Sequence, residues 1–190
     1  MPRRGLDREQ VVDAAVRIAD ADGLQAVRLA RVAGELGVRA PSLYNHVASR
    51  EALQREIALR GIAGLTAALS QAAVGRSGPD AVAALAHAYR AYAHEHPGCY
   101  AATVAAPAAG DAEHEQAAAG PVELVVAVIR PWGLGPEAQL HAVRVIRSAL
   151  HGFVALEAGG GFALPLDLDD SFEALVTMLV CGLDERAHTA

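Results

Sequence analysis

The chain has no lysine, only two cysteines, only eight aromatic residues and no long apolar run. Cys99 and Cys181 are too few and too far apart to indicate a disulfide framework, so we expect both to be small hydrophobic core residues. A helix that spans a bilayer needs roughly 18 consecutive apolar residues, which this sequence does not reach. The opening residues also lack the apolar stretch of a signal peptide. We therefore expect a cytoplasmic protein without a membrane partner.

What the chain does have is a large supply of alanine and other apolar residues. The apolar types make up 53% of the 190 residues, which is enough to bury a sizeable core. Small side chains that recur at helical spacing favour close-packed helices over sheets. No segment of useful length alternates with the period of a strand. These features predict an all-α fold.

The charges are distributed unevenly along the chain. The net charge is −6, which by itself argues against a nucleic-acid-binding protein. Residues 1–60, however, hold 10 arginines and 8 acidic residues, a balance of +2, whereas residues 61–190 hold 6 arginines and 14 acidic residues, a balance of −8. A basic N-terminal part on an acidic remainder is what a local footprint on phosphates requires.

Four helices are predicted in the N-terminal third of the chain. Asp7 is a suitable N-cap for the first helix, and Gly23 is expected to end it in a left-handed conformation. Gly37 supplies the positive φ of a tight turn between the second and third helices. Ser49 is expected to cap the fourth. The predicted helices cover 7–22, a short stretch within 29–36, 40–47, and a segment that begins after Ser49.

The remainder of the chain also shows only helical periods. Proline and glycine clusters predict breaks at 73–80, 96–98, 131–136 and 159–161. The alanine-rich stretch 101–120 is expected to be an irregular or broken helix. The other predicted helices cover 80–94, 121–130, 136–158 and 169–186.

The second and third predicted helices have the length and turn chemistry of a helix-turn-helix. Ala33 is small where the two helices must cross, and Leu43 can seal the turn. The residues left exposed on the third helix are short and polar. A recognition helix needs this mixture, because its N-terminal residues face base edges and its flanks face phosphates. These candidates are Ser42, Tyr44, Asn45 and His46.

Arginines flank this segment and extend the candidate DNA-binding set. Arg39 can donate two hydrogen bonds to a guanine. Arg3 and Arg4 can enter the minor groove or contact phosphates. Tyr44 has a second interpretation, as a core aromatic residue. The candidate phosphate contacts are Arg28, Tyr44, His46 and Arg50.

The segment Leu29-Ala30-Arg31-Val32-Ala33-Gly34-Glu35-Leu36-Gly37-Val38-Arg39-Ala40-Pro41-Ser42-Leu43-Tyr44-Asn45-His46-Val47, followed by Ser49-Arg50-Glu51-Ala52-Leu53, closely resembles the DNA-binding motif of TetR-family regulators. The resemblance covers roughly residues 7–58. It implies that Tyr44, His46 and Arg50 contact phosphates. It also implies a helix-turn-helix DNA-binding domain at 1–55 and a helical ligand-binding and dimerisation domain at 56–190.

The sequence departs from the family's pattern in two places. Arg28 and Leu29 lie where many members carry a capping Ser or Thr, and Arg39 lies where many carry a capping Ser. Both changes remove a neutral cap and add positive charge beside the predicted DNA-binding face. The usual cap contact is therefore in doubt, and Arg28 and Arg39 become candidate DNA contacts.

The last two predicted helices carry long apolar stripes. Two such helices from each of two chains can form a four-helix bundle with twofold symmetry, and the resemblance implies the same homodimer. A dimer places two recognition helices about one DNA turn or slightly more apart, which predicts a near-palindromic operator. The stripes are Leu140, Val143, Ile146, Leu150, Phe153 and Leu156, then Phe172, Leu175, Val176, Leu179, Val180 and Leu183.

Histidines and aromatic residues gather in the middle of the chain. Such side chains among apolar helices suit a small, mostly apolar effector with one or two polar anchors, and no cofactor is expected. His151-Gly152 also resembles a Trp-His-Gly element that names one TetR subfamily, although no Trp precedes it here. His151 is either a pocket residue or a core histidine. The candidate ligand-binding residues are His87, Tyr89, Tyr92, His94, Tyr100, Trp132 and His151.

The sequence leaves some alternatives to a ligand-responsive repressor open. His94, His96 and Cys99 are close in sequence and are residue types that zinc accepts, so a metal-sensing regulator is one alternative, although the spacing fits no standard zinc finger. A helical interaction module without DNA binding is another, and an activator in place of a repressor stays open. An enzyme is not expected, because no Gly-x-Ser-x-Gly or phosphate-binding loop motif is present.

Overall fold

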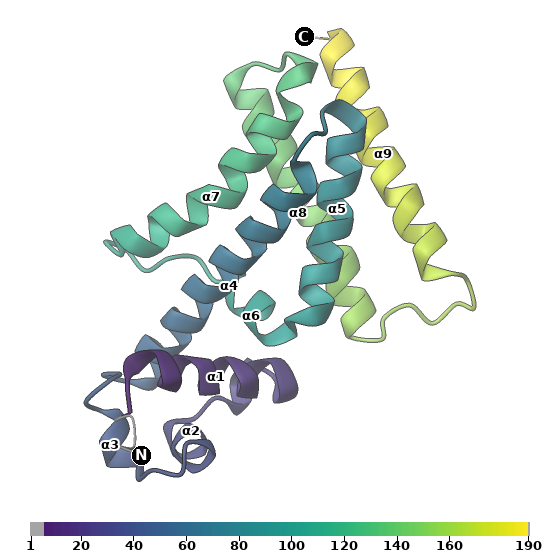
Figure 1. The fold of residues 1–190 in the computed structure, drawn as a ribbon. Helices are drawn as coiled ribbons and strands as arrows, with labels where there is room; N and C mark the ends of the chain where they lie inside the picture. Colours follow the sequence, from purple (N-terminus) through teal and green to yellow (C-terminus); the bar gives the residue numbers. More distant parts are fainter. Residues whose placement is uncertain (1–5, 190) are drawn as a thin grey trace. The chain divides into compact units, whose positions relative to one another are not determined.

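The computed structural model describes residues 6–189, and within that range the chain forms nine α-helices, two short 3-10 helices and no strand (Figure 1). The predicted all-α fold is confirmed. In chain order the elements are α1 (Arg8–Asp22), η1 (Leu24–Ala26), α2 (Leu29–Glu35), α3 (Ala40–Leu43), α4 (Arg50–Ala73), α5 (Gly78–Glu95), α6 (Pro97–Ala102), α7 (Ala112–Ile129), η2 (Arg130–Trp132), α8 (Pro136–Ala158) and α9 (Leu168–Thr189).

The contacts divide the described residues into two compact units. Unit 1 contains the residues up to Gly64 together with Glu95–Ala117. Unit 2 contains Leu65–His94 and the residues from Ala118 onwards. Unit 1 therefore combines the N-terminal helices with α6 and the first turn of α7, which lie far along the chain. No local pattern in the sequence predicts this combination.

The first helix begins as predicted but ends differently. The Asp7 side chain accepts a hydrogen bond from the backbone of Gln10, whose side chain accepts one from the backbone of Asp7, which completes a capping box. Gly23 ends α1 with a φ of 84° and a ψ of 157°. The positive φ is confirmed, but the predicted left-handed helical conformation is wrong, because the chain extends from Gly23 into η1.

The recognition segment, by which we mean residues 39–47, contains a shorter helix than predicted. Helix α3 covers only Ala40–Leu43, and the residues after it form a turn. Within that turn the His46 N–H donates to the Leu43 carbonyl over 2.8 Å, a three-residue spacing tighter than that of an α-helix. The turn buries Leu43 and Val47 on one side, and it brings Ser49 to the start of α4. There the Ser49 hydroxyl accepts from the Ala52 N–H over 3.1 Å, as the cap prediction requires.

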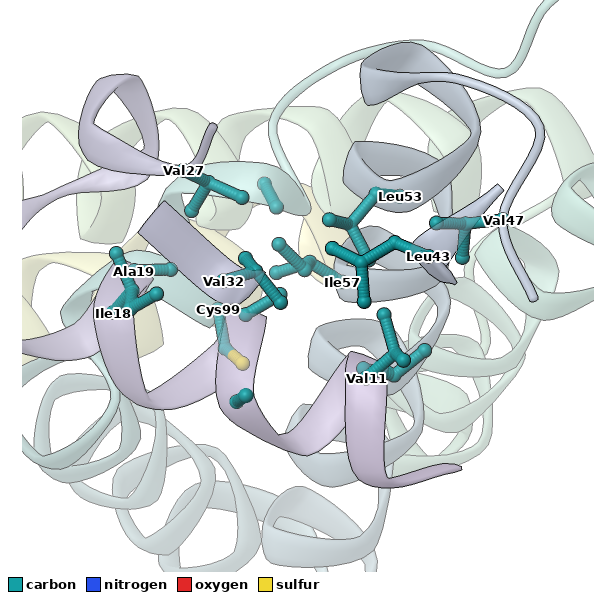
Figure 2. Packing of buried hydrophobic residues seen from close by; sticks show 14 of the residues in the cluster. Val11, Ile18, Ala19, Val27, Val32, Leu43, Val47, Leu53, Ile57 and Cys99 are labelled. Carbon is teal, nitrogen blue, oxygen red and sulfur yellow. The ribbon is translucent and has the colours of Figure 1, made fainter. Parts of the chain in front are cut away.

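The core of unit 1 is an apolar cluster that draws on both parts of the unit (Figure 2). The apolar residues at helical spacing on α1 are buried: Val11, Val12, Ala15, Ile18 and Ala19. Leu43, Leu53 and Ile57 have no exposed surface. Cys99 and Ala102 of α6 belong to the same cluster, so the helix-turn-helix does not close its core alone. Truncating a fully buried Leu to Ala in such a core costs about 2–5 kcal/mol.

Two glycines let α6 lie against the N-terminal helices. A Cβ on Gly98 would stand 2.1 Å from the backbone carbon of Ala19, and a Cβ on Gly61 would stand 2.5 Å from the Cys99 carbonyl oxygen. No side chain fits at such distances. The positions at 61 and 98 are therefore held by glycine because backbone meets backbone there, not because a turn needs a positive φ.

In unit 2, α7 and the last two helices depart from their predicted roles. Helix α7 continues through Pro121, where the sequence predicted a new helix, so the loss of one backbone donor does not end it. The stripes predicted for the dimer interface are mostly buried inside this chain. Val143, Ile146, Leu150 and Phe153 of α8 and Phe172, Val176, Leu179 and Leu183 of α9 form its core.

No single helix among the described residues is long and apolar enough to cross a bilayer. One bent pair, Ala112–Trp132 and Pro136–Ala158 at 117°, meets the length and composition criteria jointly.

Gly98→Ala tests the contact between α6 and α1. The added methyl group would overlap the Ala19 backbone, so we expect the free energy of unfolding to fall by about 1–3 kcal/mol. Denaturant unfolding measures this change. Gly34→Ala in α2 is the matched control. Its Cβ meets no atom within 4 Å, and the change should raise stability by about 0.5–1 kcal/mol. Equal stability of the Gly98→Ala protein and the parent would show that α6 does not pack as described.

Candidate nucleic-acid interface

The arginines of unit 1 fall into two groups. Five of them form ion pairs with carboxylates and are neutralised within the protein. Among the described residues, the other three have no carboxylate within ion-pair distance: Arg28, Arg39 and Arg50. The paired arginines are Arg8 with Glu56, Arg17 with Glu35, Arg31 with Asp22, Arg55 with Asp111, and Arg60 with Asp13.

Arg28 and Arg39 occupy the N-cap positions of α2 and α3. Both have extended backbones and exposed side chains, and neither side chain caps its helix. Local stability favours Ser, Thr, Asp or Asn at these positions. A cation there is also disfavoured by the positive end of the helix. The two positions thus sacrifice local stability, which is understandable if an anion such as a DNA phosphate approaches them.

Arg50 has a structural role that sequence reasoning missed. Its Nε donates to the Val27 carbonyl over 3.0 Å, and its Nη2 lies 3.4 Å from the Gln25 carbonyl and 3.3 Å from the Gln25 side-chain oxygen. The start of α4 is thereby bound to the residues just before α2. Its predicted contact with phosphate stays a prediction, and only part of the guanidinium is available for it.

The recognition segment presents its predicted polar residues to the surface. The Tyr44 side chain is 58% exposed, so its interpretation as a core aromatic residue is wrong. Ser42 and Asn45 are also exposed, and His46 is half-buried. With Arg39 they form one continuous segment on the recognition helix and the turn after it. The predicted contacts Arg3 and Arg4 lie outside the described residues.

Two polar contacts attach the segment Glu95–Ala117 to the helix-turn-helix. One Asp20 oxygen accepts hydrogen bonds from the backbone N–H groups of Gly98 and Cys99, at 2.9 and 2.8 Å, and so caps α6 from α1. Asp20 and Cys99 are 79 residues apart. Sequence reasoning missed this contact because an Asp near the end of a helix has no local signature for capping a distant one.

The second contact joins α4 to the start of α7. Arg55 donates to both oxygens of Asp111 and, over 2.8 Å, to Glu113. These hydrogen bonds lower the pKa of Asp111 to about 2 and raise the pKa of Arg55. Because the carboxyl pKa is depressed, the stabilisation is present above the ordinary carboxyl range and is lost only as pH falls through about 2.

The predicted ligand-binding residues lie in different surroundings. Tyr89 and Tyr92 are buried on α5, and Tyr100 is buried in unit 1. His87 and His94 are exposed and contact carboxylates, with 3.0 Å to Glu173 and 2.8 Å to Glu157 respectively. Trp132 donates to Asp184 over 2.6 Å, and His151 is half-buried on α8. Their role in ligand binding stays a prediction.

A charged cluster in unit 2 was also missed. Arg90 of α5 donates to both Glu157 oxygens, at 3.0 and 2.5 Å, and to Asp169 over 2.7 Å. Its guanidinium carbon lies 4.8 Å from the centroid of the Phe172 ring and 5.6 Å from that of Phe153. Hydrogen bonding from Arg90, with a smaller contribution from His94, lowers the pKa of Glu157. The cluster joins α5, α8 and α9.

The metal-binding alternative finds little support. Within residues 6–189, no group of three or more His, Cys, Asp or Glu side chains is placed to hold a metal ion. Burial, together with the nearby Asp20 charge, raises the pKa of Cys99 to about 12. Without a metal beside it, this thiol therefore stays protonated at neutral pH.

Comparisons with known proteins agree with this geometry. A family model described as "Tetracyclin repressor-like, C-terminal domain" matches residues 82–179. An uncharacterized HTH-type transcriptional regulator of Mycobacterium tuberculosis is 39% identical over 95% of this chain and 83% of its own length. A second such regulator, YobS of Bacillus subtilis, is 36% identical over 96% of this chain and 95% of its own.

Solved structures share the fold over almost the whole chain. A protein of unknown function from Rhodococcus sp. RHA1 has a TM-score of 0.80 and 26% identity, covering 96% of this chain and 97% of its own. BioQ with its natural double-stranded DNA operator has a TM-score of 0.69 and 21% identity, covering 95% and 99%. ActR of Streptomyces coelicolor in complex with (S)-DNPA has a TM-score of 0.67 and 20% identity, covering 95% and 98%.

Arg39→Ser and Arg50→Ala should change stability in opposite directions. A serine N-cap offers an acceptor to the first turn of α3, so Arg39→Ser is expected to raise the free energy of unfolding by about 0.5–1 kcal/mol. Arg50→Ala removes the donors to Val27 and Gln25, so it is expected to lower that free energy by about 1–2 kcal/mol. Urea unfolding of both proteins measures these changes. A stable Arg50→Ala protein would contradict the structural role assigned to Arg50.

Proposed function

The chain belongs to the TetR family of HTH-type transcriptional regulators, and from that membership we propose that it is a homodimeric repressor that a small-molecule effector releases from a palindromic operator. Its relatives are regulators, not enzymes. A DNA-binding regulator acts where the chromosome lies, so the cytoplasm is the compartment we propose. Residues 1–55 supply DNA binding in this proposal, and residues 56–190 supply ligand binding and dimerisation.

One observation carries the proposal: among the described arginines of unit 1, those without a carboxylate partner stand at the N-caps of the two helices of the helix-turn-helix, Arg28 and Arg39, and at the start of α4, Arg50. Arg28 and Arg39 have positive charge that no described carboxylate neutralises, at positions where that charge is locally unfavourable. DNA phosphates would compensate both. BioQ, whose fold is similar, was solved with its operator DNA, which supports the same use of the fold here.

The recognition segment has groups for both kinds of DNA contact. In this proposal Arg39 donates two hydrogen bonds to a guanine, and the short side chains Ser42 and Asn45 contact base edges. The remaining candidates suit phosphates, because a phenol, an imidazole and a guanidinium can each donate to a phosphate oxygen. These are Arg28, Tyr44, His46 and Arg50, with Arg3 and Arg4 reaching the backbone or the minor groove.

The outer faces of α8 and α9 support a homodimer. Val145 and Leu156 of α8 are each 52% exposed, and Met178 of α9 is 69% exposed. Gly152 on the same side of α8 has open space where a Cβ would stand. A glycine inside a helix costs about 1 kcal/mol relative to alanine and has no packing reason within this chain. Close approach of a second chain supplies that reason.

Effector release requires that binding favours a conformation unsuited to the operator. Unit 1 contains parts that can transmit such a change, because Asp20 and Arg55 bind the segment Glu95–Ala117 directly to α1 and α4. A shift of that segment therefore acts on the helix-turn-helix. ActR, solved with (S)-DNPA, supports a small-molecule effector. A coupling free energy of about 1–3 kcal/mol weakens DNA binding roughly 5- to 150-fold.

Selection from a random duplex pool tests the DNA-binding proposal. We expect a near-palindrome whose half-sites lie about one DNA turn or slightly more apart. On that duplex, Arg39→Ser should weaken binding by about 1–3 kcal/mol, roughly 5- to 150-fold, and relax specificity at one position. Arg28→Ser should weaken binding on all duplexes. It should also reduce, by about 1, the steepness with which the logarithm of the binding constant falls with the logarithm of the salt concentration.

Fluorescence anisotropy over a series of salt concentrations measures both the affinity for the duplex and the dependence of that affinity on salt. Arg17→Ser is a control, because Arg17 is already paired with Glu35 at 2.8 Å. If folded Arg39→Ser and Tyr44→Ala proteins hold every duplex as tightly as the parent, the recognition segment does not contact DNA. No retention of the parent protein on duplex DNA at low salt would favour a helical interaction module instead.

Val145→Arg tests the dimer surface. An arginine on the outer face of α8 would leave a charge buried in the dimer, so we expect monomers in sedimentation equilibrium and weaker operator binding. Val74→Arg is the matched control, because Val74 is 74% exposed and lies between α4 and α5, not on α8 or α9. If the Val145→Arg protein forms dimers with the same association constant as the parent, this surface is not the dimer interface.

A further inference from the structure

Apart from the buried tyrosines and Cys99, His114 is the one residue with a polar or charged side chain that is buried among the described residues, with 5% of its surface exposed. Its Nε2 is closed to solvent, and no described residue offers that atom a hydrogen-bond partner. A buried polar atom without a partner costs about 1–3 kcal/mol. Such atoms are rare in folded proteins, and each one calls for an explanation. An apolar residue of similar size would avoid the cost.

The position of His114 connects it to the DNA-binding helices. Its backbone N–H donates to Asp111 Oδ1 over 3.1 Å in the first turn of α7. The same Asp111 oxygen accepts from Arg55 Nη2 over 2.5 Å, and Arg55 lies on α4. Helix α4 begins directly after the recognition segment. A movement of the first turn of α7 therefore reaches α4 through one side-chain contact, and all these residues lie in unit 1.

The charges near His114 restrict what can bind it. Arg55 contacts three carboxylates, those of Asp111, Glu113 and Glu56. Glu56 also pairs with Arg8, so two guanidiniums face three carboxylates and one negative charge is left over. An anionic ligand beside this cluster would be repelled, whereas a neutral or cationic one would not. In the imidazole tautomer that carries its proton on Nδ1, Nε2 accepts a hydrogen bond, so for that tautomer an O–H or N–H donor completes the pairing.

We propose that His114 Nε2 is the polar anchor of the effector, and that the effector is an apolar molecule with a hydroxyl or amino donor and no negative charge. This rests on the proposed function. Because Nε2 is closed in the present conformation, a ligand reaches it only when the first turn of α7 shifts. A ligand that pairs with Nε2 favours the shifted conformation. That shift disturbs the Asp111–Arg55 contact and, through α4, the recognition segment.

The test uses the full-length protein, with phenol, anisole and benzoate as probes. All three share one ring. Phenol has a donor, anisole has none, and benzoate is anionic. The imidazole Cε1–H resonance of His114 is assigned as the signal that His114→Leu removes. We expect phenol at millimolar concentration to shift this resonance, and anisole and benzoate to leave it in place. Equal shifts from all three probes, or none from phenol, would overturn the proposal.

Thermal unfolding adds a readout that needs no ligand. His114→Leu and His114→Phe remove the buried nitrogen, so at least one of them should unfold at the parent's midpoint or above it. His141→Leu is the control, because His141 is exposed on α8. If both substitutions at 114 lower the midpoint by several degrees while His141→Leu does not, Nε2 is already paired in the protein and the proposal fails.

Operator binding separates this proposal from the proposed function. Phenol should weaken operator binding by the parent and by His141→Leu, and should leave that of folded His114→Leu unchanged. Equal release of all three proteins would place the anchor elsewhere and overturn the proposal, while the repressor function stands. A shifted His114 resonance in a protein that binds no duplex would support the anchor and refute the repressor.

Discussion

The approach of α6 to α1 is the contact on which unit 1 depends. Backbone meets backbone at Gly98 and Ala19, and the Asp20 carboxylate accepts the first free N–H groups of α6. This arrangement brings Cys99 and Ala102 into the core of the helix-turn-helix. The DNA-binding part is therefore completed by a segment from the middle of the chain, and a change in that segment has a direct physical route to the recognition helix.

Charge pairing separates the arginines that hold the fold from those available to a partner. Arg55 and Arg90 each serve several carboxylates and join distant elements. Exposed ion pairs contribute little to stability, typically less than about 1 kcal/mol. Here these ion pairs neutralise charge within the protein. Among the described arginines of unit 1, those left without a carboxylate partner are Arg28, Arg39 and Arg50, at the starts of α2, α3 and α4. The chain can thus be acidic overall and still offer a basic surface to DNA.

Local features of the fold could be predicted, and features that depend on distant partners could not. The caps at Asp7 and Ser49, the turn at Gly37 and the bounds of α8 follow from side chains within a few residues of each other. The true length of α3 could not be predicted, because the burial of Val47 and the start of α4 decide where it stops. The continuation of α7 through Pro121 is likewise set by packing, which outweighs the local penalty of proline.

The sequence by itself determined the all-helical class, the helix-turn-helix and the residues of the recognition segment, because helical period, capping and turn chemistry act over a few positions. The tertiary structure alone decided which arginines are neutralised, which faces of α8 and α9 are buried, and that His114 Nε2 is enclosed with no partner among residues 6–189. Those outcomes depend on groups tens of residues away, such as Asp111 for Arg55 at a separation of 56 residues. Only the folded chain brings such groups within hydrogen-bonding distance.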